Sequence, residues 1–159
     1  MPEVVTYRVE YRQHFERLNR EWIERYFGLE PPDLEVFQDP ESHIVEPGGQ
    51  IFFVLDGGEV QGTCAVVPHG KDGFELAKMA VEPAARGRGY GDILMQAAID
   101  FARRAGARRL TLVSNTRLEP AIRLYRKYGF VPVPIDGGHG YERVDIQMEL
   151  GLATAKGEG

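Results

Sequence analysis

The sequence predicts an α/β (α+β) domain built on a mixed, mostly antiparallel sheet. Three apolar segments between residues 51 and 81 are joined by short turns, which is typical of an antiparallel meander. Two amphipathic helical segments then alternate with short apolar segments, which is typical of crossover connections within a sheet. A doubly wound parallel sheet is excluded, because the hairpin-linked strands precede the first long crossover helix.

The N-terminal third is predicted to hold one strand and one long helix. Residues 4–9 have the pattern of a strand, and residues 14–27 carry an apolar stripe at helical spacing that Gly28 closes. Residues 29–49 are rich in proline, aspartate and glutamate, so we expect a loop there with room for one short helix.

The rest of the chain follows from the same patterns. The predicted meander strands are 51–55, 60–67 and 74–81. The later elements expected are a helix at 90–105, a strand at 110–113, a helix at 118–128, a strand beginning at Phe130 and a strand at 144–150. Gly106 and Gly129 are expected to end the two helices, because glycine readily adopts the left-handed conformation found there.

Size and composition indicate one ordinary globular domain. The chain has 159 residues, of which 43% are hydrophobic and 27% are charged. We expect the domain to span residues 1–151, and the polar, glycine-rich residues 152–159 to form a disordered tail.

Charge and residue usage limit the partners. The net charge of −5 argues against nucleic acid as the main partner, and no apolar run is long enough to span a membrane. Cys64 is the single cysteine, which excludes an internal disulfide and fits a reducing cytoplasm. The four histidines lie singly, without metal-ligand spacing, so no metal is expected. Exposed strand edges, such as that of the last strand, could pair with a second copy of the chain, so a homodimer is compatible with the sequence.

The most informative segment is a glycine-rich turn between a strand and a helix, with the sequence Arg86-Gly87-Arg88-Gly89-Tyr90-Gly91. Its glycines allow a tight turn, and the amides of the first helical turn carry the positive end of the helix dipole. Such a turn favours an anion, with a pyrophosphate as the natural guest. The spacing matches neither a Walker loop nor a dinucleotide fingerprint. Taken alone, it is also compatible with a glycine-rich turn that carries arginines for solubility.

Two motifs together resemble the Gcn5-related N-acetyltransferases. The glycine-rich turn matches the central motif of that family, Arg/Gln-x-x-Gly-x-Gly/Ala, between a strand and a helix. The run Ala121-Ile122-Arg123-Leu124-Tyr125-Arg126-Lys127-Tyr128-Gly129-Phe130 matches its second signature. The resemblance covers residues 4–150 and implies helices on both faces of the sheet, with a bulge that splays the central strand from its neighbour.

The resemblance implies acetyl-coenzyme A as co-substrate. Its pyrophosphate would bind the amides of residues 86–91, and its pantetheine arm would pair with the strand ending Met79-Ala80-Val81. The Met79 amide would donate to the thioester carbonyl. The family often places asparagine three residues before the alanine of the second motif, where this chain has Leu118. Asn115 lies three residues earlier and is a candidate replacement.

The reaction implied is direct attack of an amine on the thioester. Losing a proton costs an alkylamine about 4–5 kcal/mol at pH 7, which calls for a general base. Glu75 is the first candidate, because its position before Val81 matches a catalytic glutamate of the histone acetyltransferase branch. Strand alternation would place Glu75 on the same side as Met79 and Val81. The weaker candidates for the base are His69, His43 and Glu46.

The leaving thiolate needs a hydrogen-bond donor. The Tyr125 hydroxyl matches the general acid of the family, although full proton transfer from a phenol is uphill by about 2 kcal/mol. We therefore expect Tyr125 mainly to hydrogen-bond the developing charge; the alternative is a core tyrosine. Cys64 is expected to be a buried strand thiol rather than a nucleophile.

The acceptor side is less defined. Aromatic residues of the N-terminal third and one C-terminal loop would form it: Trp22, Tyr26, Phe27, Phe37 and residues 134–141. Acidic side chains nearby, among them Glu30 and Asp33, would attract a cationic amine or simply form a solvated loop. Three functions stay open: an N-acetyltransferase acting on the primary amine of a small molecule, a protein or peptide N-acetyltransferase, and a non-catalytic acyl-coenzyme A binding module.

Overall fold

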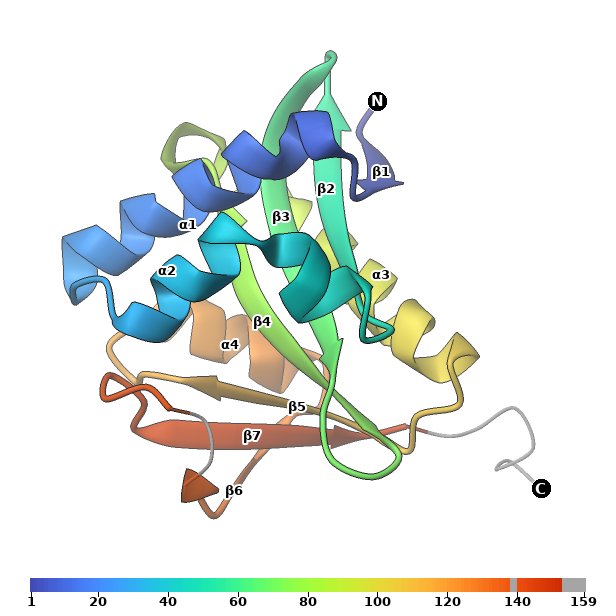
Figure 1. Ribbon diagram of the computed structural model, residues 1–159, viewed down its shortest axis with the longest axis vertical. Coiled ribbons are helices and arrows are strands. Elements are labelled where there is room, and N and C mark those ends of the chain that lie inside the picture. The colour runs from blue at the N-terminus through green and yellow to red at the C-terminus, as the bar shows by residue number, and fades with distance from the viewer. Residues whose placement is uncertain (138–139, 153–159) are drawn as a thin grey trace.

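A seven-stranded sheet runs through the residues that the computed structural model describes, 1–137 and 140–152 (Figure 1). Its strands are β1 (Glu3–Thr6), β2 (Gln50–Asp56), β3 (Glu59–Pro68), β4 (Gly73–Val81), β5 (Arg109–Ser114), β6 (Val131–Val133) and β7 (Ile146–Gly151). Their spatial order is β1-β2-β3-β4-β5-β7-β6. The β4–β5 pair is parallel, and the other neighbouring pairs are antiparallel, so the predicted mixed, mostly antiparallel sheet is confirmed.

Helices cover both faces of this sheet. The helical elements are η1 (Val9–Tyr11), α1 (Arg12–Tyr26), α2 (Pro31–Gln38), η2 (Glu41–Val45), η3 (Pro83–Ala85), α3 (Tyr90–Arg104) and α4 (Glu119–Lys127). Helices α1 and α2 lie on one face, with α3 and α4 on the other (Figure 1). The three long helices that the sequence predicts are confirmed.

The predicted loop at residues 29–49 is more helical than expected. It holds α2 and the π-helical turn η2. Pro31 occupies the start of α2, where its missing N–H costs nothing, and the Glu30 N–H donates to Asp33 Oδ2 at 2.9 Å. These two devices stabilise a helix that has only a weak apolar stripe. The first strand is shorter than predicted, since after Thr6 the Tyr7 N–H turns to the Gln50 side chain at 3.3 Å.

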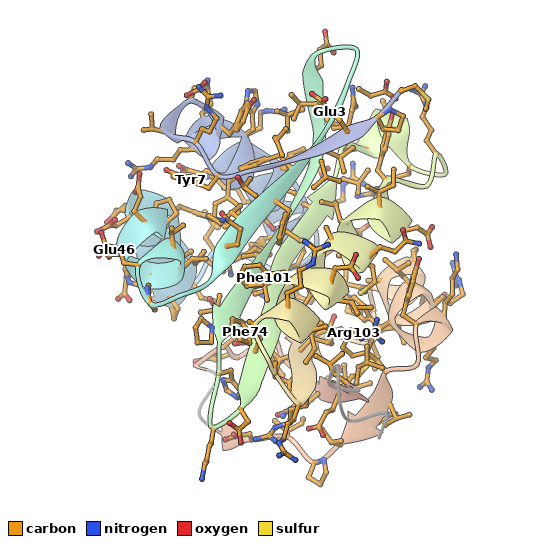
Figure 2. The ribbon with its side chains drawn as sticks, turned by 90° about the vertical axis from the view of Figure 1, so that its right-hand side faces the viewer. Glu3, Tyr7, Glu46, Phe74, Phe101 and Arg103 are labelled. Carbon is orange, nitrogen blue, oxygen red and sulfur yellow. The ribbon has the colours of Figure 1, made fainter. Side chains whose placement is uncertain are left out.

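Each face of the sheet has its own apolar core. The α3/α4 face buries Phe52, Cys64, Leu94 and Met148, while the α1/α2 face buries Phe15, Ile23, Phe53 and Ala65. On the α3 side, Phe74 of β4 meets Phe101 edge-to-face at 5.6 Å (Figure 2). The alternation of side chains between these cores fixes which residues of β4 can face which helices.

The C-terminal strand differs from the expectation in one respect. Strand β7 was expected to have an exposed edge, but it pairs with β5 on one side and with β6 on the other. That expectation is therefore wrong. Leu152, expected to begin the tail, is buried and its N–H donates to Arg108 O at 2.8 Å. The other residues of the predicted tail, 153–159, lie outside the described residues.

Candidate active site

Strands β4 and β5 separate part of the way along the sheet. Their parallel pairing covers only Gly73–Glu75 on β4, opposite Arg109–Thr111 on β5. From Leu76 onward β4 has no β5 partner in the ladder, although both strands continue. The separation leaves one edge of β4 available for an added extended chain. The splay expected at this strand is therefore present.

A bulge on the other edge of β4 accompanies the separation. Ala65 of β3 pairs with Ala77, but Thr63 pairs with Ala80, so two residues of β4 lie opposite the single Cys64. Lys78 at the bulge has a φ of 55°, which is unusual for a residue with a side chain. The extra residue reverses the alternation of side chains along β4.

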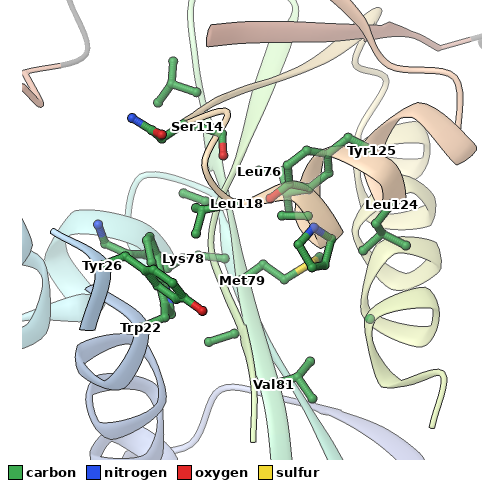
Figure 3. Close-up of a pocket in the computed structure, with 18 of the residues that line it drawn as sticks. Trp22, Tyr26, Leu76, Lys78, Met79, Val81, Ser114, Leu118, Leu124 and Tyr125 are labelled. Carbon is green, nitrogen blue, oxygen red and sulfur yellow. The ribbon is translucent and has the colours of Figure 1, made fainter. Parts of the chain in front are cut away.

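A cavity of about 790 Å³ passes through the separation of the two strands. Its lining includes residues of α1 and the loop before β7 on one side, and of α3 and α4 on the other. Figure 3 shows Trp22, Tyr26 and Lys78 on one side of β4, with Met79, Leu124 and Tyr125 on the other. One continuous space therefore connects the two faces of the sheet, and we refer to its halves as the α1/α2 half and the α3/α4 half.

The glycine-rich turn forms one end of the α3/α4 half. Gly87 and Gly89 have φ angles of 85° and 86°, a conformation that glycine adopts without strain. The first backbone bond of α3 runs from Ile93 N to Gly89 O at 3.1 Å, so the amides of the preceding turn come before the helical ladder. At Gly91, an added Cβ would lie 3.2 Å from the Leu124 side chain, so this glycine allows α3 and α4 to approach.

Most of the turn lines the cavity. The residues of the turn in the lining are Arg86, Gly87, Gly89, Tyr90 and Gly91. Arg88 is exposed and outside the lining, so of the two predicted arginines only Arg86 faces this space. The Tyr90 ring is buried, and its hydroxyl donates to Asp56 Oδ2 at 2.5 Å, which anchors the first turn of α3 to the β2–β3 hairpin.

The bulge brings the end of β4 into the same space. Met79, Ala80 and Val81, where the resemblance implies a pantetheine arm, all line the cavity. Met79 and Val81 pack against the α3/α4 core, while Ala80 belongs to the opposite core. The predicted cofactor strand thus borders the cavity next to the glycine-rich turn.

Tyr125 lies in the α3/α4 half of the cavity. Its side chain points from α4 toward β4 (Figure 3) and is 9% exposed. Burial raises the pKa of Tyr125 to about 12, with a smaller contribution from Cys64. The hydroxyl therefore stays protonated at neutral pH and is available as a donor. Cys64 is fully buried in β3, as expected, and burial raises the pKa of its thiol as well.

Glu75 lines the cavity on the α1/α2 face of the sheet, opposite to the face that the sequence predicts. It pairs with Val67, which packs against the α1/α2 core, whereas Met79 and Val81 pack against the α3/α4 core. The expectation that Glu75 shares a side with Met79 and Val81 is wrong, because the bulge at Lys78 reverses the alternation. Glu75 Oε1 lies 4.0 Å from His69 Nδ1.

Asn115 lines the cavity at the loop after β5. Its Nδ2 donates to Arg143 O at 2.7 Å, and its Oδ1 accepts from the Arg117 N–H at 2.8 Å. Both polar atoms thus hold the surrounding loops together. A contact to a pantetheine arm would use the second lone pair or the second amide proton.

Aromatic side chains form much of the α1/α2 half. Trp22, Tyr26 and Phe27 line it, as predicted. Phe37 does not; it is 1% exposed and packs edge-to-face on Phe15 at 5.9 Å. Tyr141, from the predicted loop, also lines this half.

An ion cluster that the sequence did not predict lies behind these rings. Lys78 Nζ donates to Asp33 Oδ1 at 2.6 Å and to the Tyr141 hydroxyl at 3.0 Å. Arg143 donates to both oxygens of Asp33, at 2.8 and 2.7 Å, and to Glu30 Oε2 at 3.3 Å. Burial would raise the pKa of Asp33, but Arg143 and Lys78 outweigh it and lower the pKa to about 2.

This cluster corrects the expectation of an acidic loop. Asp33 is fully buried, and Glu30 and Asp33 serve as partners of cations instead of facing an acceptor. The one sequence feature that points to this cluster is Lys78, a charged residue within the otherwise apolar strand at residues 74–81. The alternation of side chains along the strand does not reveal which residue pairs with it. Among the described residues, no group of three or more histidine, cysteine or acidic side chains could hold a metal ion, and no helix could cross a membrane.

Comparisons with known proteins agree with this geometry. The sequence model of the acetyltransferase (GNAT) family matches residues 12–130. An IAA acetyltransferase from Azospirillum brasilense is 31% identical over 134 residues, covering 83% of this chain and 87% of that protein. Streptothricin acetyltransferase from Streptomyces lavendulae is 34% identical over 121 residues, covering 70% and 64%.

Solved structures share the fold. A GNAT-family acetyltransferase from Staphylococcus aureus Mu50 superimposes with a TM-score of 0.87 at 15% identity, covering 96% of this chain and 99% of that chain. The ribosomal-protein-S18-alanine N-acetyltransferase from Escherichia coli does so with a TM-score of 0.75 at 20% identity, covering 98% and 96%. The family match covers most of the sequence, and the chain therefore belongs to the acetyltransferase (GNAT) family and is an N-acetyltransferase.

Proposed function

We propose that the protein transfers an acetyl group from acetyl-coenzyme A to the primary amine of a small molecule, by direct attack in a ternary complex. The observation that carries this proposal is the continuous cavity through the β4–β5 separation. The cofactor would enter it from one face of the sheet and the acceptor from the other. Their reacting groups would meet at the bulge of β4.

The cofactor would occupy the α3/α4 half. Its pyrophosphate would bind the amides of Arg86 to Gly91, where the helix dipole of α3 favours an anion. Its pantetheine arm would add as a strand along residues Met79–Val81, with a further contact at Asn115. The thioester would then lie at the bulge, with the Met79 amide as donor to its carbonyl oxygen.

Glu75 would accept the proton of the amine, and Tyr125 would donate a hydrogen bond to the leaving group. The amine nitrogen attacks the thioester carbon, the carbon–sulfur bond breaks, and the amine proton passes to Glu75 directly or through water. Glu75 lies on the α1/α2 side, where the acceptor would bind. Tyr125 would hydrogen-bond the leaving thiolate. Because its pKa is about 12, transferring the proton to a thiolate whose acid has a pKa near 8.5 is uphill by about 5 kcal/mol.

A small acceptor is favoured over a protein. The α1/α2 half is walled by aromatic rings from α1 and by Tyr141, which suits a compact molecule better than an extended peptide. Relatives differ here: streptothricin acetyltransferase is named for a small molecule, and the Escherichia coli enzyme for a ribosomal protein.

The test is thiol release from acetyl-coenzyme A with amines, amino acids and peptides, with the products identified by mass spectrometry. The proposal predicts thiol release with small amines and an amide-linked acetyl group on each product. Acetylation of peptides alone would overturn the small-molecule assignment. Tight acetyl-coenzyme A binding without transfer to any acceptor would favour a binding module.

A further inference from the structure

Three cationic side chains line the α1/α2 half of the cavity: Lys78, Arg117 and Arg143. Glu75 is the one carboxylate among the described lining residues of that half. Glu30 and Asp33, which balance Lys78 and Arg143, are not in the lining. The wall that an acceptor would meet therefore presents cationic groups, while the carboxylates that offset two of them lie behind it.

Each of these cations packs against the aromatic rings that line the same half of the cavity. The Arg117 guanidinium lies 5.2 Å from the ring centre of Phe27, which meets Trp22 edge-to-face at 6.4 Å. Arg143 lies over both Trp22 and Tyr141, at 5.6 and 4.5 Å, and Lys78 Nζ lies 4.6 Å from the centre of Tyr141. Stacking on rings holds a guanidinium face in place and leaves its N–H edge for a ligand.

Arg117 differs from the other two cations in its partners. Lys78 and Arg143 share the buried Asp33, so much of their charge is offset within the fold. Among the described residues, Arg117 has no carboxylate partner, and its guanidinium donates to Tyr26 O at 3.0 Å. This bond uses one of its five N–H donors, and the guanidinium of this exposed lining residue keeps the fork geometry that matches a carboxylate.

We infer that the acceptor carries a carboxylate beside its amine, so that the acceptor class is amino acids, with Arg117 as the main contact of the carboxylate. This inference rests on the proposed N-acetyltransferase function. A polyamine or another purely cationic amine is disfavoured, because it would bring no anion to Arg117, whose charge no carboxylate of the described residues offsets.

Trp22 offers a direct binding test. It is the single tryptophan of the chain and lies in the wall, so its fluorescence reports acceptor binding without any turnover. In the presence of coenzyme A, the protein would be titrated with matched sets built on leucine, methionine, phenylalanine and serine. Each set contains the amino acid, its carboxamide and its decarboxylated amine, which separates the carboxylate from the side chain and from amine reactivity.

The expected result is a preference for the carboxylate that depends on Arg117. In at least one set the amino acid should bind about tenfold more tightly than its amine. Arg117→Gln should remove that preference while binding of the amine is unchanged. Arg123→Gln is the matched control, because Arg123 is exposed on α4 and outside the cavity lining. Equal or tighter binding of the amine in every set, or a preference that survives Arg117→Gln, would overturn the inference.

Thiol release in the same samples separates the two proposals. Acetylation of amines without any carboxylate preference would leave the N-acetyltransferase proposal intact and overturn the amino-acid acceptor. Carboxylate-selective binding without thiol release from acetyl-coenzyme A would support the anion site and contradict the proposed transfer.

Discussion

Lys78 Nζ and Asp33 Oδ1 lie 2.6 Å apart, although the two residues are separated by 45 positions in the chain. This contact ties α2 to the bulge of β4, where Lys78 has a φ of 55°. A left-handed conformation at a residue with a side chain costs about 1–3 kcal/mol and persists only when its surroundings hold it. The ion pair is one such restraint, so the structure beneath the acceptor half stabilises the strand distortion that opens the cavity.

Replacing Asp33 is expected to destabilise the fold. Asp33→Asn leaves Lys78 and Arg143 buried without their shared carboxylate, so the free energy of unfolding at pH 7 should fall by about 3 kcal/mol. Glu16→Gln is the control, because Glu16 pairs with Arg20 at the surface and should cost less than about 1 kcal/mol. Urea unfolding measures both.

The same pair predicts a pH dependence. The pKa of Asp33 is lowered from 3.8 to about 2 in the folded state, so its stabilising contribution is complete above the unfolded value and is lost as pH falls toward about 2. The difference in the free energy of unfolding between wild type and Asp33→Asn should therefore decrease as the pH is lowered from 3.8 to about 2. A difference that stays constant over this range would contradict the assignment.

Tyr125→Phe should reduce turnover and spare cofactor binding. The hydroxyl is proposed to contact only the developing thiolate, so kcat should fall by about 10- to 1000-fold with nearly unchanged affinity for acetyl-coenzyme A. Tyr128→Phe is a matched control, because Tyr128 directly follows α4, its hydroxyl donates to Asp92 at 2.8 Å, and it lies outside the cavity lining. An unchanged rate in Tyr125→Phe would remove this residue from the mechanism.

Changes in the glycine-rich turn should weaken cofactor binding. Gly89 has a φ of 86° with open space around its Cβ position, so Gly89→Val distorts the turn through backbone strain and not through a clash within the protein. Arg86→Ala should have a milder effect. Gly70→Val carries a similar strain, at a φ of 64°, in the β3–β4 turn at the opposite end of β4, and should leave binding unchanged. Calorimetry with acetyl-coenzyme A distinguishes the three, and full affinity in both turn variants would place the phosphates elsewhere.

Glu75→Gln tests the general base. The variant keeps the size of the side chain and removes its capacity to accept a proton, so kcat should fall by about 10²–10⁴-fold at neutral pH. The reduction should shrink at high pH, where the acceptor amine is already neutral. Glu59→Gln is the control, because Glu59 is exposed at the start of β3. A uniform reduction at all pH values would indicate a structural role for Glu75.

The order of elements could be predicted from the sequence because it depends on local patterns. The stripe of α3 and the turns between β2, β3 and β4 are each encoded within a short window. The glycine-rich turn and Tyr125 each lie in a contiguous motif that the sequence alone displays, and Tyr125 and most of the turn line the cavity.

The features that could not be predicted depend on contacts between distant segments. The side of β4 that Glu75 faces follows from one extra residue at Lys78, which no periodicity reveals. The Asp33–Arg143 pair joins residues 110 positions apart, so the acidic segment could not be seen to be neutralised. The presence of Lys78, Arg117 and Arg143 together in the lining of the α1/α2 half likewise follows only from the assembled fold.

The most direct test of the ternary-complex account is an initial-rate study of thiol release, with the concentrations of acetyl-coenzyme A and an amine acceptor varied together. Because the cavity is proposed to hold both molecules at once across β4, the double-reciprocal lines should intersect. Parallel lines, together with an acetylated protein detected by mass spectrometry after incubation with acetyl-coenzyme A alone, would contradict direct attack within a ternary complex.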